Sequence, residues 1–203
     1  MTLTRRSFLS AAACAGAATA LPGKVFATVA PLRPRIDPVL KARALAALQK
    51  HRKVIPHADV IGIADFSRAS RDPRFYIVDL RYDFVTEHLC AHGRGSDPAH
   101  SGWLEYFSNE VGSEATSEGA YLTGNAYTGK YGWSMRLSGL DHTNYNAEAR
   151  AIVVHSARYA EPSMVSQFGK LGRSEGCFAL PGVSHAEAMT RLGSGRLLYA
   201  EKV

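Results

Sequence analysis

Apolar residues recur with a helical period in only a few parts of this chain. Four of them follow Asp37 at that spacing, at Leu40, Ala44, Leu45 and Leu48. This pattern predicts a helix over residues 38–53 with Asp37 as its N-cap. A second helix is predicted over 184–192, because Ser184 and Glu187 have the spacing of a capping box. Residues 163–172 are predicted to form a helical turn.

Most of the remaining apolar residues form short runs or alternate with small and polar ones, which is typical of strands. The predicted strands are 60–64, 75–80, 83–85, 119–123, 132–137, 150–155 and 196–201. Residues 150–155 predict a buried central strand because their middle is entirely apolar. The fold class that we expect is mainly β with a few helices, from about residue 37 to the end.

The first residues have the order of basic, apolar and small residues that is typical of an export signal. Arg5 and Arg6 precede an apolar run over 8–21, which is shorter than the roughly 20 residues of a membrane span. We predict a twin-arginine-type signal peptide over 1–27, cleaved after Ala20 or Ala27, and a linker over 28–36. The alternative is a cytosolic helix that happens to carry two arginines. Export would place one domain, 37–203, in the periplasm or cell envelope without stable membrane insertion.

Charge and composition narrow the choice of partners. The chain has 203 residues, of which 46% are hydrophobic and 21% charged, enough for one domain with a sizeable core. Removal of the leader, with Arg5, Arg6, Lys24 and no acid, lowers the formal charge from +6 to +3. The remaining basic residues are not clustered with aromatic ones, so nucleic acid is not an expected partner. The sequence does not indicate an oligomeric state.

Export also changes the interpretation of the cysteines. Cys14 would be removed with the signal, which leaves Cys90 and Cys177. Two cysteines in an oxidising compartment form a disulfide in many proteins, and this is one alternative for Cys177. The other is a reactive thiol.

The residues around Cys177 favour a nucleophile. Gly176 precedes it, and His155 lies upstream at the end of an apolar run. A nearby imidazole takes the proton of a thiol and makes it nucleophilic, and backbone N–H groups at Gly176 and Cys177 provide an oxyanion site. The second ring nitrogen of such a base needs an orienting group, for which the main-chain carbonyl of Ser156 is a candidate. We expect this pair to lie in a solvent-open groove.

A second cluster of chemistry-bearing residues is His88, Cys90 and His92, which would lie on one face of a strand. Two imidazoles and a thiol are zinc ligands, so a zinc protein is an alternative. Tetrahedral sites favour ligands from separate segments, and we expect no metal or other cofactor.

The pattern His155-Ser156 followed by Ser174-x-Gly176-Cys177 resembles the catalytic signature of YkuD-type L,D-transpeptidases, and specifically the murein L,D-transpeptidase catalytic domain family. The resemblance covers roughly residues 40–203. Its further motifs are His92-Gly93-x-Gly95-Ser96, Phe107-Ser108-Asn109, Gly112-Ser113, Gly119-x-Tyr121-x-Thr123, Tyr131-Gly132, Leu137-x-Gly139-Leu140 and the run from Ala149 to His155.

The resemblance implies a β-sandwich or barrel-like catalytic fold and a cysteine acyl-enzyme that acts on peptidoglycan stem peptides. Family members attack the carbonyl at the L-centre of meso-diaminopimelate, expel the terminal D-amino acid and form a thioester. A stem amine, a D-amino acid or water then resolves it, giving 3–3 cross-linking, exchange or carboxypeptidase activity. Cys177 would be the nucleophile and His155 the base. Ser156 would orient His155, Gly176 would contribute to the oxyanion hole, and Ser174 would shape the loop.

Two further residues are expected at the substrate. Arg173 is placed to meet a substrate carboxylate, and His92, in its His-Gly pair, is placed to line the cleft. The chain departs from the family signature at Glu175, where a histidine is common, and at Ala179, where asparagine or arginine is common. An inward carboxylate would raise the pKa of the thiol, so we expect Glu175 to point outward.

Two other functions compete with this interpretation. A sortase-like transpeptidase also uses histidine, cysteine and a later arginine, here Arg191 or Arg196. A non-catalytic wall-binding domain of the same fold would keep the architecture but have an unreactive Cys177.

Overall fold

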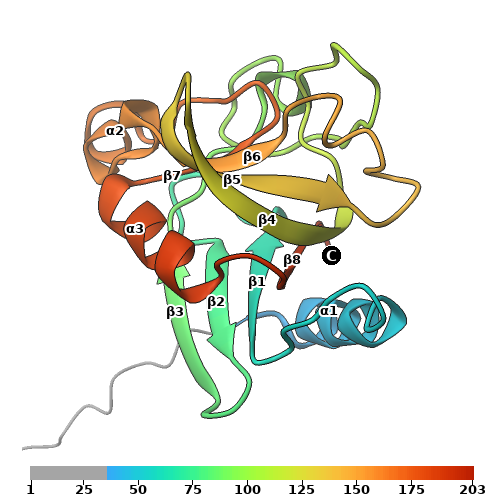
Figure 1. Ribbon diagram of the computed structural model, residues 1–203. Helices are drawn as coiled ribbons and strands as arrows, with labels where there is room; N and C mark the ends of the chain where they lie inside the picture. Colours follow the sequence, from blue (N-terminus) through green and yellow to red (C-terminus); the bar gives the residue numbers. More distant parts are fainter. Residues whose placement is uncertain (1–35) are drawn as a thin grey trace, which may run out of the picture. The chain divides into compact units, whose positions relative to one another are not determined.

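The computed structural model describes residues 36–203, so the predicted export signal and all but the last residue of the predicted linker lie outside the described residues. One eight-stranded sheet dominates the described part, with the strand order β3-β2-β1-β8-β4-β5-β6-β7 (Figure 1). The strands are β1 Val60–Asp65, β2 Phe75–Asp79, β3 Phe84–His88, β4 Gly119–Gly129, β5 Gly132–Gly139, β6 Val153–Ser156, β7 Phe178–Leu180 and β8 Leu197–Glu201. The helices are α1 Pro38–Lys50, α2 Pro162–Phe168 and α3 Gly182–Arg191, with short 3₁₀ turns at Arg94–Ser96 and Arg158–Ala160. The fold is mainly β with a few helices, as predicted.

The sheet curls into a nearly closed barrel. The long strand β4 has a register shift between Thr123 and Ala126 in its pairing with β5, and bulges of this kind increase strand bending. The chain that follows the edge strand β3 then meets the other edge strand, β7. The Ala91 N–H donates to the Ala179 carbonyl at 2.8 Å, and Gly93 forms a second bridge with Ser174. This closure places the chain around His92 beside the segment that carries Cys177.

Helix α3 follows β7 and packs beside β3, the other edge of the sheet (Figure 1). Thr86 on β3 donates its hydroxyl hydrogen to Glu187 at 2.8 Å, and the Arg191 guanidinium lies over the Phe84 ring at 5.3 Å. The strands and α3 together enclose the main core, which includes Phe75, Tyr121, Met135, Val154, Phe178 and Leu198.

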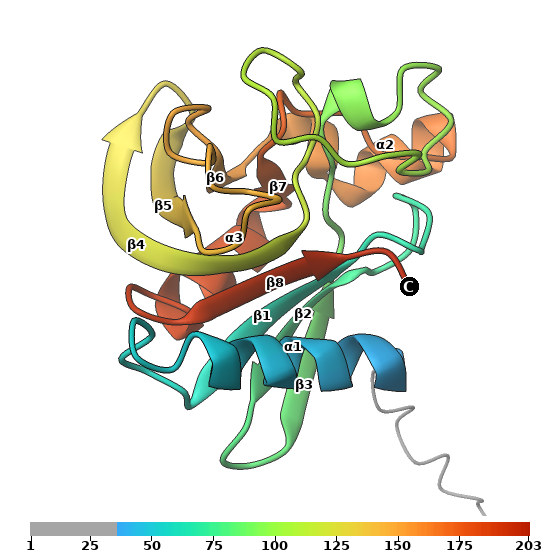
Figure 2. The same ribbon diagram turned by 90° about the vertical axis from the view of Figure 1, so that its right-hand side faces the viewer.

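Helix α1 covers the outer face of the barrel beside β8 and β1 (Figure 2). Its apolar side, with Leu40, Ala44 and Leu48, packs on Ile61, Ile63, Tyr76 and Leu197. The predicted N-cap is confirmed, because the Asp37 carboxylate accepts from the N–H groups of Val39 and Leu40. The helix ends at Lys50 rather than residue 53.

Two predictions of local structure differ from the fold, and one strand was not predicted. The strand predicted over 150–155 begins only at Val153, after a series of turns that ends at Ala151. The capping box at Ser184 is wrong, since α3 already begins at Gly182 and makes no side-chain cap. Strand β7 was not predicted, because three apolar residues before Pro181 are too few to show a period.

Candidate active site

His155 lies on β6 with its side chain on the face opposite the main core. Val154 points into the core, and successive strand residues alternate between faces. Its Nδ1 lies 2.9 Å from the Ser156 carbonyl oxygen, which can only accept, so Nδ1 carries the hydrogen and Nε2 is left with a lone pair. Burial lowers the pKa of His155, while the bond to Ser156 opposes this shift. His155 is therefore a neutral imidazole with a fixed tautomer, as a general base requires.

Cys177 lies immediately before β7, which pairs in parallel with β6. The register sets His155 opposite Ala179, two residues after Cys177. Cys177 is a free thiol, as is Cys90, so the disulfide alternative is not supported. Its Sγ donates to the Ala151 carbonyl at 3.6 Å, and among the described residues no hydrogen bond joins Cys177 to His155. The groove is not solvent-open, because Cys177 is 5% exposed and His155 only 1%.

Some groups around Cys177 raise the pKa of its thiol and others lower it. Burial is the largest influence and raises the pKa of the thiol to about 11. The Val153 N–H and the Arg150 guanidinium lower it, whereas the Glu175 carboxylate raises it. The thiol is therefore protonated near neutral pH, and it needs a base and a change of environment to react.

Ser174 fixes the loop before Cys177. Its hydroxyl donates to the Cys177 carbonyl at 2.7 Å and accepts from the Gly176 N–H at 3.2 Å. The Gly176 N–H is therefore occupied in this state, contrary to the expectation that it is free for an oxyanion. Gly176 has φ +112°, and a Cβ there would lie 2.8 Å from the Ala115 carbonyl oxygen, so the position requires glycine.

Tyr131, at the turn between β4 and β5, covers His155. The two rings stack with centroids 4.5 Å apart and planes 20° apart, and the Tyr131 hydroxyl donates to Glu175 at 3.2 Å. Tyr159 approaches the same imidazole edge-on at 6.4 Å. The Glu175 side chain is half-exposed, and its charge still raises the pKa of the Cys177 thiol. Sequence reasoning used Tyr131 only as a part of a motif and did not find this contact.

Arg150 connects the loop over 108–117 to the site. It donates to the Ser108 carbonyl at 2.7 Å, to the Ser113 hydroxyl at 3.2 Å and to the Ala115 carbonyl. A Cβ on Gly176 would lie 3.2 Å from its guanidinium, so Arg150 packs against the nucleophile loop. In the sequence, the feature that marks Arg150 is its position just before a buried apolar run.

The two expected substrate-binding residues differ in their surroundings. Arg173 is partly exposed and donates to the Pro98 carbonyl at 3.1 Å and to the Asp97 carbonyl, and among the described residues no carboxylate forms a salt bridge with it. His92 is 1% exposed, with its ring nitrogens 2.7 Å from Arg74 and 3.3 Å from Asp97. Burial and the Arg74 cation lower the pKa of His92 to about 3. His92 therefore belongs to a buried polar network and does not line a cleft.

The zinc alternative is not supported by the geometry. Strand β3 ends at His88, whose ring contacts Thr86 and Glu187, whereas His92 faces Arg74 and Asp97. Across residues 36–203, no group of three or more histidine, cysteine, aspartate or glutamate side chains is arranged to hold a metal ion.

His185 on α3 is a second buried histidine near the site. Its ring meets Trp133 edge-on at 5.9 Å, and its Nε2 has no hydrogen-bond partner among the described residues. Burial and the proximity of His155 lower its pKa. Nothing in the sequence pattern pointed to this residue.

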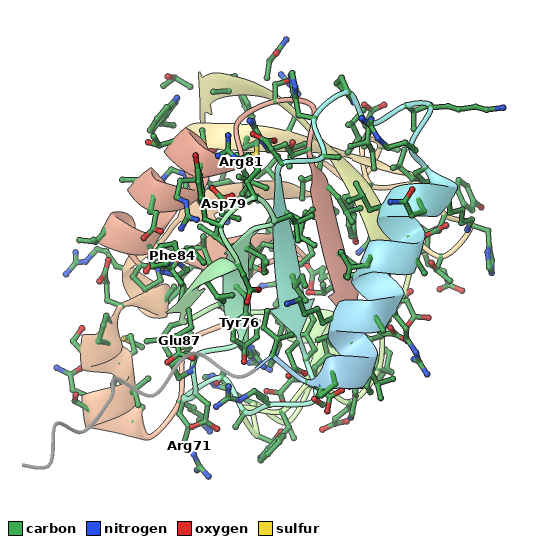
Figure 3. The ribbon with its side chains drawn as sticks, turned by 90° about the horizontal axis from the view of Figure 1, so that it is seen from below. Arg71, Tyr76, Asp79, Arg81, Phe84 and Glu87 are labelled. Atoms are coloured by element: carbon green, nitrogen blue, oxygen red, sulfur yellow. The ribbon has the colours of Figure 1, made fainter. Side chains whose placement is uncertain are left out.

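A separate groove of about 700 Å³ lies between α3 and the β2–β3 hairpin. Asp79, Phe84 and Thr86 line one side, and Ala186, Glu187, Thr190 and Arg191 line the other. Figure 3 shows Asp79, Arg81 and Phe84 together at this end of the hairpin. Neither Cys177 nor His155 lines this groove, whereas Arg191, the candidate arginine of the sortase-like alternative, does.

The family model for the L,D-transpeptidase catalytic domain matches residues 33–200, which include every residue of the site described above. The chain belongs to this family. Because the chain belongs to this family, its fold is that of an L,D-transpeptidase and not that of a sortase. A comparison with curated proteins finds no match.

Solved L,D-transpeptidases are among the similar structures. An L,D-transpeptidase from Mycobacterium smegmatis is 15% identical, with a TM-score of 0.43 over 70% of this chain and 58% of that one. L,D-transpeptidase 3 from Mycobacterium tuberculosis, in complex with a faropenem-derived adduct, is 13% identical, with a TM-score of 0.46 over 71% and 60%. The helical cell shape determining protein Pgp2 from Campylobacter jejuni is 12% identical, with a TM-score of 0.44 over 82% and 57%. The chain thus spans less than two thirds of the length of each.

Proposed function

We propose that this chain is an exported peptidoglycan L,D-transpeptidase in which Cys177 is the nucleophile and His155 the general base. The observation that carries the proposal is the pairing of β6 with β7 in an L,D-transpeptidase domain. The pairing supports the proposal because β7 directly follows the free thiol of Cys177, while β6 carries His155, whose Nδ1 is bonded to Ser156 and whose Nε2 is left to accept a proton.

The reaction follows from these groups. His155 Nε2 takes the proton of the Cys177 thiol, and the thiolate attacks the stem-peptide carbonyl at the L-centre of meso-diaminopimelate. The N–H groups of Cys177 and Gly176 hold the oxyanion, the latter after it exchanges its bond to Ser174. His155 then gives the proton to the departing D-amino acid, which leaves a thioester. An amine or water attacks the thioester and regenerates the thiol.

We interpret the described state as a resting state of such an enzyme. Burial raises the pKa of Cys177 to about 11 and lowers that of His155, so proton transfer from the thiol to the imidazole is unfavourable in this state. The barrier to proton transfer falls when substrate is bound, because the sulfur attacks the substrate carbonyl as it loses its proton. The negative charge then passes to the carbonyl oxygen. Substrate binding must also move Tyr131, which covers His155.

The proposed function includes a cellular location for the domain. Residues 1–27 have the twin-arginine pattern, and L,D-transpeptidases as a family act on the cell wall, so we place the domain in the periplasm or cell envelope. No helix within residues 36–203 has the length and apolar character needed to span a membrane. Arg173, a partly exposed cation, is proposed to meet a carboxylate of the stem peptide.

One observation favours a second candidate function. The burial of Cys177 and the raised pKa of its thiol also fit a wall-binding domain that does not react. Incubation with purified disaccharide-tetrapeptide, with products measured by mass, separates the two. A transpeptidase releases the terminal D-amino acid and yields a cross-linked, exchanged or tripeptide product, and Cys177→Ala yields none. Binding of the tetrapeptide with no product would contradict the enzymatic proposal.

A further inference from the structure

The Glu175 carboxylate acts on Cys177 through its charge and is linked to His155 through Tyr131. It precedes Cys177 by two residues, and its Oε2 accepts the Tyr131 hydroxyl at 3.2 Å. Tyr131 in turn stacks on His155. Its side chain is 53% exposed, so a bound ligand has access to it. Glu175 therefore accepts a hydrogen bond from the tyrosine that covers His155, and it is also exposed to solvent.

The charge of Glu175 is poorly compensated. Its nearest cation is Arg94, whose guanidinium nitrogen is 3.8 Å from Glu175 Oε1, at the outer limit of an ion pair. Arg94 is already bonded through two nitrogens to both carboxylate oxygens of Glu114. A bidentate pair of this kind is the stronger of the two contacts, so most of the Arg94 charge is committed to Glu114.

The bond between Glu175 and Tyr131 is also weak. Hydroxyl donors lie about 2.5–2.7 Å from carboxylate oxygens in strong bonds, and this distance is 3.2 Å. A primary ammonium group offers three donors and a full positive charge, so it forms a stronger contact with the same carboxylate. An incoming cation thus displaces the Tyr131 hydroxyl.

We propose that Glu175 is a specificity-determining residue that binds the side-chain ammonium group of the stem-peptide residue whose carbonyl is attacked, in exchange for its hydrogen bond to Tyr131. The inference rests on the proposed transpeptidase function. It assigns a role to the position at which this chain departs from the family signature, where a neutral or cationic histidine is common.

Two consequences follow from the exchange. Tyr131 loses the bond that holds its ring over His155, so the base becomes accessible only when the correct substrate binds. The ammonium group also neutralises the carboxylate that opposes ionisation of Cys177. The enzyme therefore favours stems whose side-chain amine is free over stems in which that amine is already acylated.

The test compares two stem tetrapeptides that differ only in whether the side-chain amine is free or acetylated. Turnover by the wild type is measured as kcat/KM, and binding is measured by calorimetry in a Cys177→Ala background. The wild type is expected to prefer the free amine by about tenfold in both measurements, since one charged hydrogen bond is gained. Glu175→Gln, which keeps an acceptor for Tyr131, is expected to lower this preference below about twofold. Glu110→Gln removes an exposed carboxylate elsewhere and is expected to leave the preference unchanged.

The outcomes separate the inference from the proposed function. Turnover with the same preference in wild type and Glu175→Gln overturns the inference and leaves the transpeptidase standing. A preference in binding that depends on Glu175, without turnover, supports the inference as a binding subsite and overturns the enzyme. Absence of both binding and turnover overturns both.

Discussion

The Tyr131 ring lies nearly parallel to the His155 imidazole, with centroids 4.5 Å apart, and its hydroxyl is bonded to Glu175. This contact joins the β4–β5 turn to strand β6. It contributes to the burial of His155, the proposed general base, which is 1% exposed. In the proposed reaction, Tyr131 must therefore move before substrate reaches His155.

Removal of this cover is expected to change the titration of His155. Burial lowers the pKa of His155, so Tyr131→Ala, which hydrates the ring, is expected to shift that pKa upward toward its ordinary value near 6.5. The shift is measured by NMR of the imidazole protons, with His155→Gln to assign them. Tyr145→Ala removes an exposed tyrosine with no ring contact to His155 and is expected to cause no shift. An unchanged titration in Tyr131→Ala would show that other groups bury the ring.

Arg150 is expected to assist ionisation of the nucleophile. Its cation lowers the pKa of Cys177 against the larger effect of burial. Arg150→Met should therefore shift the pH profile of Cys177 alkylation by iodoacetamide to higher pH and slow the reaction at pH 8 by severalfold. Arg71→Met, an exposed change away from the site, serves as the control. If the two variants have the same pH profile of alkylation, Arg150 does not assist ionisation of Cys177 and only holds the loop over 108–117.

The loop before Cys177 is expected to require Gly176. Alanine there must adopt φ +112° and place its Cβ 2.7 Å from Ile152 and 2.8 Å from the Ala115 carbonyl oxygen. We expect Gly176→Ala to lower the free energy of unfolding by roughly 1–3 kcal/mol. Gly169→Ala isolates the backbone effect, since Gly169 has φ +71° and no atom within 4 Å of its Cβ position. Thermal unfolding of the two variants measures the difference, and an equal loss in both would argue against close packing at Gly176.

His92 is expected to make stability depend on pH. The folded His92 has a pKa of about 3, whereas the unfolded residue takes up a proton near pH 6.5. The unfolded state therefore binds more protons between these values, and stability is lost as the pH falls below about 6.5, by up to about 1.4 kcal/mol per pH unit. Urea unfolding at pH 7, 6 and 5 measures this slope. His92→Gln is expected to be less stable at pH 7 but to have a shallower slope, and an equal slope would refute the assignment.

The sequence predicted the elements whose signals are local. Asp37 caps α1 through its own side chain, and the alternating strands 119–123 and 132–137 lie within β4 and β5. It also predicted that Ser156 provides the carbonyl for His155, because that contact joins neighbouring residues. Strand β7 is too short for a period, and its strand character comes from pairing with β6 and with Ala91.

The sequence did not predict the residues of the site that make contacts between segments far apart in the chain. Tyr131 meets His155 through the β5–β6 register, and His185 approaches it from a helix that follows β7. The expectation for His92 was wrong because the nearby charged partner, Arg74, lies 18 residues earlier and is fully buried with it. A motif position alone does not show which side of the backbone faces the cleft.

The account depends on Cys177 as a nucleophile served by His155, and acylation of the intact protein by a carbapenem tests this most directly. Intact mass spectrometry is expected to show one adduct in the wild type and in Cys90→Ala, which changes a fully buried thiol, and none in Cys177→Ala. His155→Gln is expected to slow acylation by at least about a hundredfold while its circular dichroism is unchanged. An adduct that persists in Cys177→Ala, or no adduct on the folded wild type, would contradict the account.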